Sequence, residues 1–116
     1  MTDSLKTLAL ALDDFASERD WRQFHAPKNL ACALAVEASE LLEHFQWMPE
    51  EQSRSLSAEK LAAVTDEVAD VLLYLIQFSS ALGIDPVAAA QNKLHRNAER
   101  YPVETARGSS RKHSEL

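Results

Sequence analysis

Apolar residues recur every three or four positions along most of the chain, which is the spacing of one face of an α-helix. A first stripe predicts a helix from Ser4 to Asp20 with Asp3 or Ser4 as its N-cap; its members are Leu5, Leu8, Leu12 and Phe15. A second helix is predicted to begin at Pro27 and to run to about Trp47. Pro27 suits a first helical turn, and Met48–Pro49 provides the stop.

Two more helices follow a polar linker, "PEEQSRSLSAEK". One is predicted from Ala58 to Leu82, with Ser57 as N-cap and Gly83 as the residue after its end. The next starts at Asp85–Pro86 and continues to about Arg100. No stretch alternates in the manner of a strand. The pattern predicts an all-α bundle of four main helices, with a domain over residues 1–102 and a polar tail over 103–116.

The two central helices, 27–47 and 58–82, carry apolar residues on more than one face. Four short helices cannot cover two such surfaces within one small chain, so a second subunit is the simplest cover. We therefore expect a homo-oligomer. Cys32, the single cysteine, sits in one of these apolar runs and is interpreted as a buried thiol.

The charge and composition of the chain argue against some classes of function. The chain has 116 residues and a formal net charge of −6, which argues against a general nucleic-acid or membrane-surface binder. The N-terminus lacks the pattern of a secretion signal, and no apolar run reaches membrane-spanning length. With one unpaired cysteine, these features predict a soluble, cytoplasmic protein.

One residue breaks the apolar pattern of the second helix. Glu37 lies on the stripe between Leu34 and Leu41, and Glu40 projects from the same face three residues later. The third helix repeats this spacing with Glu67 and Asp70. Two antiparallel helices can bring four such carboxylates together, and like charges at that distance need protons or cations between them. Oxygen ligands favour hard divalent ions, Mg²⁺ above all in a phosphate-handling site.

Two other interpretations of the acidic pairs must be weighed. Such pairs are common on solvated helix faces, in which case the chain would be a non-catalytic helical scaffold or partner-binding module. A di-iron bundle also places glutamates on facing helices, but it needs Glu-x-x-His on two of them. Here the pairs end in Glu40 and Asp70, so the di-iron hypothesis is weak.

The segments "EASE" and "EVAD" resemble the E-x-x-E and E-x-x-D motif of the MazG-like all-α nucleoside triphosphate pyrophosphohydrolases. "ERDWRQFHAPKNL", "ELLEHFQW", "DEVADVLLYL" and "RYPVETARGSSRKHSEL" further resemble the dCTP pyrophosphatase branch of that family. The resemblance covers the chain from about Phe15 to Leu116.

This resemblance implies a Mg²⁺-dependent enzyme that cleaves a nucleoside triphosphate to the monophosphate and pyrophosphate, acting on dCTP or modified pyrimidine deoxynucleotides. Carried over by position, the metal ligands are Glu37, Glu40, Glu67 and Asp70. The nucleotide would contact Trp21, Arg22, Gln23, Phe24, His25, Trp47 and Tyr74. The resemblance also suggests a tetramer built as two dimers.

Three points of the site depend on individual residues. Glu40 is our candidate for the general base that activates water. Trp21 and Trp47 suit either stacking on a nucleobase or packing on the core. Leu12 stands where the animal dCTP enzymes carry a substrate-contacting histidine, which leaves the preferred base open.

Overall fold

The computed structural model describes residues 4–116 and is helical throughout, without a strand among them. The elements in chain order are α1 (Ser4–Glu18), the 3₁₀ turn η1 (Arg22–Phe24), α2 (Pro27–Glu43), α3 (Glu50–Ser53), α4 (Ala58–Ala81), α5 (Pro86–Arg100), α6 (Val103–Ala106) and η2 (His113–Glu115). The all-α prediction with four main helices is confirmed: α1, α2, α4 and α5 are the long ones.

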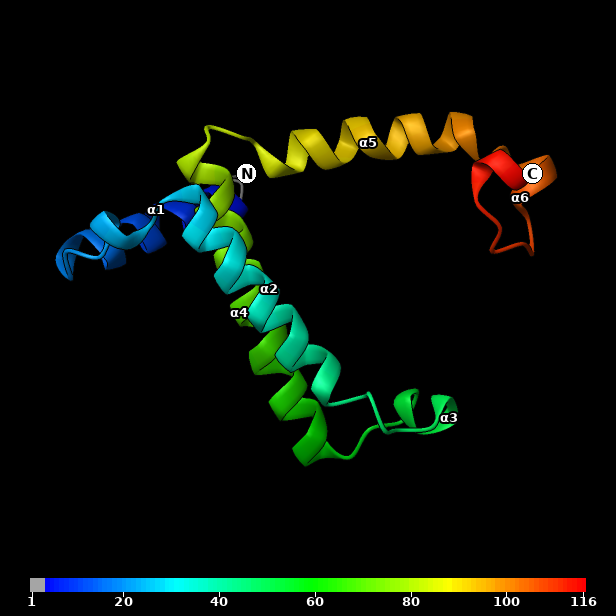
Figure 1. Cartoon of the computed structure of the whole chain (residues 1–116), viewed down its shortest axis with the longest axis horizontal. Coiled ribbons are helices and arrows are strands. Elements are labelled where there is room, and N and C mark those ends of the chain that lie inside the picture. The colour runs from blue at the N-terminus through cyan, green and yellow to red at the C-terminus, as the bar shows by residue number, and fades with distance from the viewer. Residues whose placement is uncertain (1–3) are drawn as a thin grey trace. The chain divides into compact units, whose positions relative to one another are not determined.

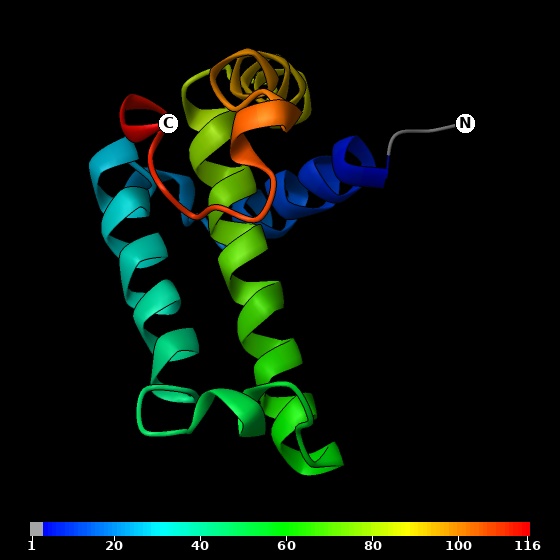
Figure 2. The same cartoon turned by 90° about the vertical axis from the view of Figure 1, so that its right-hand side faces the viewer.

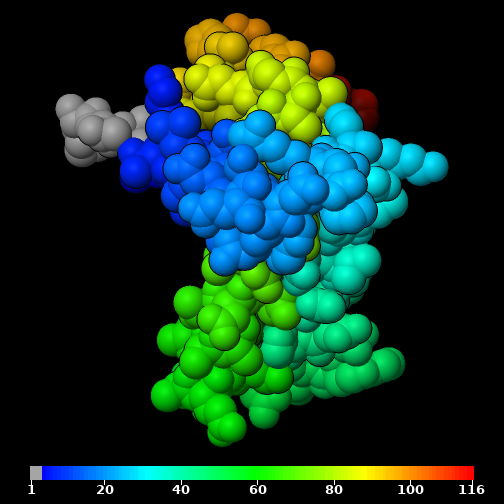
Figure 3. Space-filling model, turned by 90° about the vertical axis from the view of Figure 1, so that its left-hand side faces the viewer, coloured from blue at the N-terminus to red at the C-terminus, as the bar shows by residue number. Residues whose placement is uncertain are grey.

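The chain divides into two compact units, with the boundary between Gly83 and Ile84. In the first unit α2 and α4 lie side by side and antiparallel, joined through α3 (Figures 1 and 2). Helix α1 packs against α4 and lies across one end of the α2–α4 pair (Figure 3). The second unit consists of α5, α6 and η2. The boundary expected at residue 102 stays a prediction.

Helix starts agree with the sequence prediction. The Ser57 hydroxyl accepts a hydrogen bond from the Lys60 amide, and the Asp85 carboxylate accepts from the amides of Val87 and Ala88. Each cap satisfies amide groups that the first turn of a helix leaves unpaired. Gly83, with φ of 68°, takes the left-handed conformation that follows α4. The expected N-cap at Asp3 lies outside the described residues.

α5 ends at Arg100 as predicted, but the ends of α1 and α2 differ from the prediction. α1 stops at Glu18 rather than Asp20, and α2 stops at Glu43 rather than Trp47. After Glu43 the amide of Phe45 bonds to the carbonyl of Leu42, only three residues back, as the chain tightens ahead of Pro49. The short helices α3 and α6 were expected as a linker and a tail.

The described part of the chain buries very little. Ala16, Leu30 and Ile76 are the buried apolar residues, and Ser79 is the buried polar one. Cys32 is exposed, so its interpretation as a buried thiol was wrong; it lies on a face of α2 that the other described residues leave uncovered. No single described helix is long and apolar enough to cross a membrane, although α4 and α5 pass that test of length and composition as one bent pair.

Candidate metal centre and nucleotide pocket

Three of the four predicted metal ligands meet between α2 and α4. One carboxylate oxygen from each of Glu37, Glu67 and Asp70 lies within 4.8 Å of the other two. Glu37 and Glu67 are half-buried and Asp70 is exposed, so the group faces solvent on one side. The antiparallel helices supply this geometry because residues three or four apart share a helix face.

Two oxygens in this group are buried without a partner. Oε2 of Glu37 and Oε2 of Glu67 are shielded from solvent and accept no hydrogen bond. A buried acceptor left unsatisfied costs roughly 1–3 kcal/mol, and more when it is charged. Two such oxygens facing a third carboxylate form the donor set that a hard divalent cation requires. The residues present therefore fit a metal ion.

The electrostatics of Glu37 reflect the same crowding. Burial is the largest cause that raises the pKa of Glu37 from 4.5 to about 7; the carboxyl groups of Glu40 and Glu67, which would share a proton held by Glu37, come next, and the negative charges of Glu40 and Asp70 follow. Glu40 is thus placed against Glu37, one turn further along α2, although it lies outside the closest group of three. A proton on Glu37, or a cation bound among the carboxylates, would relieve the repulsion within the group.

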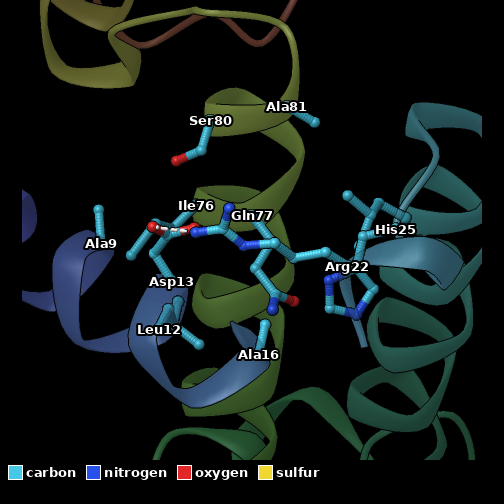
Figure 4. A pocket seen from close by; sticks show the side chains of 11 residues that line it. Ala9, Leu12, Asp13, Ala16, Arg22, His25, Ile76, Gln77, Ser80 and Ala81 are labelled. Atoms are coloured by element: carbon cyan, nitrogen blue, oxygen red, sulfur yellow. Dashed lines mark ion pairs between the residues drawn. The ribbon is translucent and has the colours of Figure 1, made fainter. Parts of the chain in front are cut away.

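A separate pocket of about 220 Å³ lies where α1, η1 and α4 meet. Leu12, Ala16, Leu30 and Ile76 are among its apolar lining, and Asp13, Arg22, His25, Gln77 and Ser80 add polar groups (Figure 4). Arg22 and His25 are predicted nucleotide contacts, and Leu12 is the residue that the resemblance aligns with a histidine of the animal dCTP enzymes. Asp13, Gln77 and Ser80 were not predicted. The sequence held one indication of Asp13: it is a charged residue on the same face of α1 as Ala9 and Ala16.

Trp21 and Gln23, two more of the predicted nucleotide contacts, lie in or beside the turn between α1 and η1. Asp20 takes a left-handed conformation (φ 55°), and the amide of Trp21 donates to the carbonyl of Ala16 at 2.9 Å. The Trp21 ring packs edge-on against Phe15, with ring centres 5.7 Å apart. This is a Schellman motif with its usual apolar contact. The Gln23 side chain donates to both the carbonyl and the carboxylate of Asp20, which fastens the turn.

The remaining predicted contacts lie apart from the pocket. Phe24 is 61% exposed, so it does not pack on the core of this chain. Trp47 follows the C-terminal end of α2 and is 89% exposed, which excludes the packing alternative within the chain. Tyr74 is half-buried on α4, one turn after Asp70.

Comparison with known proteins points to one family. The profile of the MazG-like family matches residues 32–116. The chain is 42% identical to dCTP pyrophosphatase 1 of Bos taurus and 43% identical to that of Homo sapiens, each over 105 residues, or 89% of this chain. It spans 62% of the length of these relatives.

A solved structure has the same fold. A pyrophosphatase from Archaeoglobus fulgidus superposes with a TM-score of 0.82 at 33% identity, over 88% of this chain and 95% of that one. The sequence match and the structural match together cover both helices that carry the carboxylates. The chain belongs to the MazG-like family.

Proposed function

We propose that this protein is a Mg²⁺-dependent nucleoside triphosphate pyrophosphohydrolase that releases pyrophosphate and leaves the nucleoside monophosphate. The observation that carries the proposal is the pair of buried, unpartnered oxygens of Glu37 and Glu67 beside Asp70. Relatives that are 42% and 43% identical over 89% of this chain are named dCTP pyrophosphatase 1, which supports dCTP or a modified pyrimidine deoxynucleotide as the substrate.

Each carboxylate has a role in this proposal. Glu37, Glu67 and Asp70 hold the metal with Glu40, whose side chain lies against Glu37. Bound Mg²⁺ would neutralise phosphate oxygens and acidify a water molecule. Glu40 is our candidate to accept the proton of that water, because it sits at the edge of the closest group of three. The exposed side of Asp70 leaves an open approach for a triphosphate.

The predicted nucleotide contacts lie at opposite ends of α2. Trp21, Arg22, Gln23, Phe24 and His25 precede the helix, and Trp47 follows it. Helix α2 has 17 residues and is therefore about 25 Å long. One base cannot touch both ends. We infer that a base stacks on Trp47 of one chain and meets the segment 21–25 of another, with Tyr74 beside the sugar and phosphates.

Assembly as a homo-oligomer follows from the same argument and from exposure. Large apolar side chains lie exposed along α2 and α4; they include Val36, Leu42, Leu61, Val68 and Leu72. Monomers rarely expose contiguous apolar surface of this kind. We propose a tetramer of two dimers, which sedimentation at micromolar concentration tests: a stable monomer contradicts it. We place the protein in the cytoplasm, where exposed Cys32 stays reduced.

The deciding experiment is pyrophosphate release from a panel of nucleoside triphosphates, with and without Mg²⁺. We expect release only with the metal and fastest from a pyrimidine deoxynucleotide. Glu37→Gln and Asp70→Asn should each lower turnover by about 100-fold or more while the protein stays folded. Glu43→Gln, on the same helix but outside the group, is the matched control. Release that does not need Mg²⁺ would contradict the proposed metal dependence, and no release from any triphosphate would favour the non-catalytic scaffold.

A further inference from the structure

The pocket between α1, η1 and α4 contains an ion pair that the proposed reaction does not yet use. The guanidinium of Arg22, from η1, reaches across the face of α4 to the carboxylate of Asp13 on α1 (Figure 4). Both residues line the pocket, whose remaining polar side chains are His25, Gln77 and Ser80. At about 220 Å³ the pocket is smaller than the usual site for a drug-sized ligand, so it suits one ring system rather than a whole nucleotide.

Stability gives little reason for this pair. Each side chain is 58% exposed, and exposed ion pairs contribute a median of about 0–1 kcal/mol to folding. The turn that precedes Arg22 is already fixed by the Schellman bonds of Trp21 and by the Gln23 contacts to Asp20. What the pair does fix is the direction of a long, otherwise flexible arginine side chain at the pocket.

The orientation has a chemical consequence. A guanidinium is a planar donor with five N–H groups and no acceptor. In the described residues the guanidinium of Arg22 contacts Asp13 through Nη2 and donates to no other group, so most of its N–H donors stay available. A ligand that binds to these N–H groups must present hydrogen-bond acceptors to them. Cytosine, thymine, uracil and guanine carry a carbonyl oxygen, whereas adenine does not.

We propose that Asp13 is a positioning residue for substrate recognition: it holds Arg22 so that the guanidinium donates to a carbonyl oxygen of the base. The inference rests on the proposed function and deepens it. It predicts selection for oxo-bearing bases over adenine, in the pocket that Leu12 also lines. Arg22 touches the substrate, and Asp13 acts through Arg22.

The test uses Asp13→Asn, which keeps the shape of the side chain and removes its charge. We expect KM for dCTP and dTTP to rise about five- to tenfold, with kcat unchanged and with dATP unaffected. Asp14→Asn is the matched control, because Asp14 is the next acidic residue of α1, is exposed and does not line the pocket. Asp13→Glu should restore most of the affinity for dCTP.

A double-mutant cycle separates positioning from independent effects. Arg22→Gln should show the same loss for oxo-bearing bases, and the double variant Asp13→Asn/Arg22→Gln should be no worse than Arg22→Gln alone. The proposal is overturned if Asp13→Asn behaves as Asp14→Asn does, if its loss is equal for dATP, or if the two losses add. A wild-type protein that releases no pyrophosphate at all would instead refute the proposed function.

Discussion

At the scale of single residues, Glu37 links the fold to the chemistry. Burial, the neighbouring carboxyl groups of Glu40 and Glu67, and the charge of Asp70 raise the pKa of its carboxyl group to about 7. The folded, metal-free protein therefore binds more protons than the unfolded chain between about pH 4.5 and 7. A position on the apolar stripe of α2 is costly for an anion, and a cation or a proton removes that cost.

This pKa predicts the pH dependence of metal-free stability. The contribution of Glu37 is present in full below about pH 4.5 and is lost as the pH rises through about 7, so the urea midpoint in EDTA should fall over that range. Glu37→Gln should flatten this fall, since glutamine does not titrate, and Glu43→Gln should not. The comparison needs urea titrations at pH 5 and pH 8. Equal falls for wild type and Glu37→Gln would contradict the prediction.

Trp47 gives a second prediction at this scale. The ring is 89% exposed, so its removal costs no packing within the chain. If a base stacks on it, Trp47→Ala should raise KM for every triphosphate by about tenfold, because stacking contributes about 1–3 kcal/mol whatever the base. Trp47→Phe keeps an aromatic face and should stay near wild type. An unchanged KM in Trp47→Ala would show that the base binds elsewhere.

At the scale of elements, the turn after α1 is held by several hydrogen bonds around one residue with a positive φ. Asp20 holds a positive φ without being glycine, and the bonds of Trp21 and Gln23 depend on it. A β-branched residue is poorly suited to this conformation, so Asp20→Val should lower the free energy of unfolding by about 1–2 kcal/mol. Asp20→Gly should stay close to wild type. Thermal or urea unfolding of the two variants tests this prediction. Equal stability of Asp20→Val and Asp20→Gly would contradict it.

The sequence predicted which segments form helices, and where the helices begin, better than where they end. Caps such as Ser57 and Asp85 are local, so their helices begin where expected. α1 and α2 end early because short-range bonds after Glu18 and Glu43 compete with one more helical turn, and apolar spacing alone does not register that competition. Glu37, Glu67 and Asp70 were predictable from their i, i+3 spacing. Asp13 was not, because its partner Arg22 lies beyond a turn.

At the scale of the whole molecule, a chain whose described residues include three buried apolar ones needs another source of burial. The predicted nucleotide contacts lie at the two ends of α2, about 25 Å apart. A homo-oligomer would bring contacts from two chains to the same nucleotide, so assembly would also serve catalysis. If the metal group and Trp47 of one chain work with the segment 21–25 of another, each active site is shared. The site then exists only in the oligomer, and diluting the protein should lower its specific activity along with its mass.

Subunit mixing tests this sharing directly. Glu37→Gln disables the metal group, and Trp21→Ala/His25→Ala removes contacts of the segment that meets the base, so each variant alone should have little activity at substrate concentrations below KM. Unfolded together and refolded at equal amounts, they form mixed pairs in which one site combines both intact halves. Random pairing puts about a quarter of all sites in that state, so about a quarter of wild-type turnover should return. Each variant refolded alone is the control. Activity that stays at the level of the separate variants would mean that each site is built within a single chain, and that Trp47 or the segment 21–25, but not both, contacts the base.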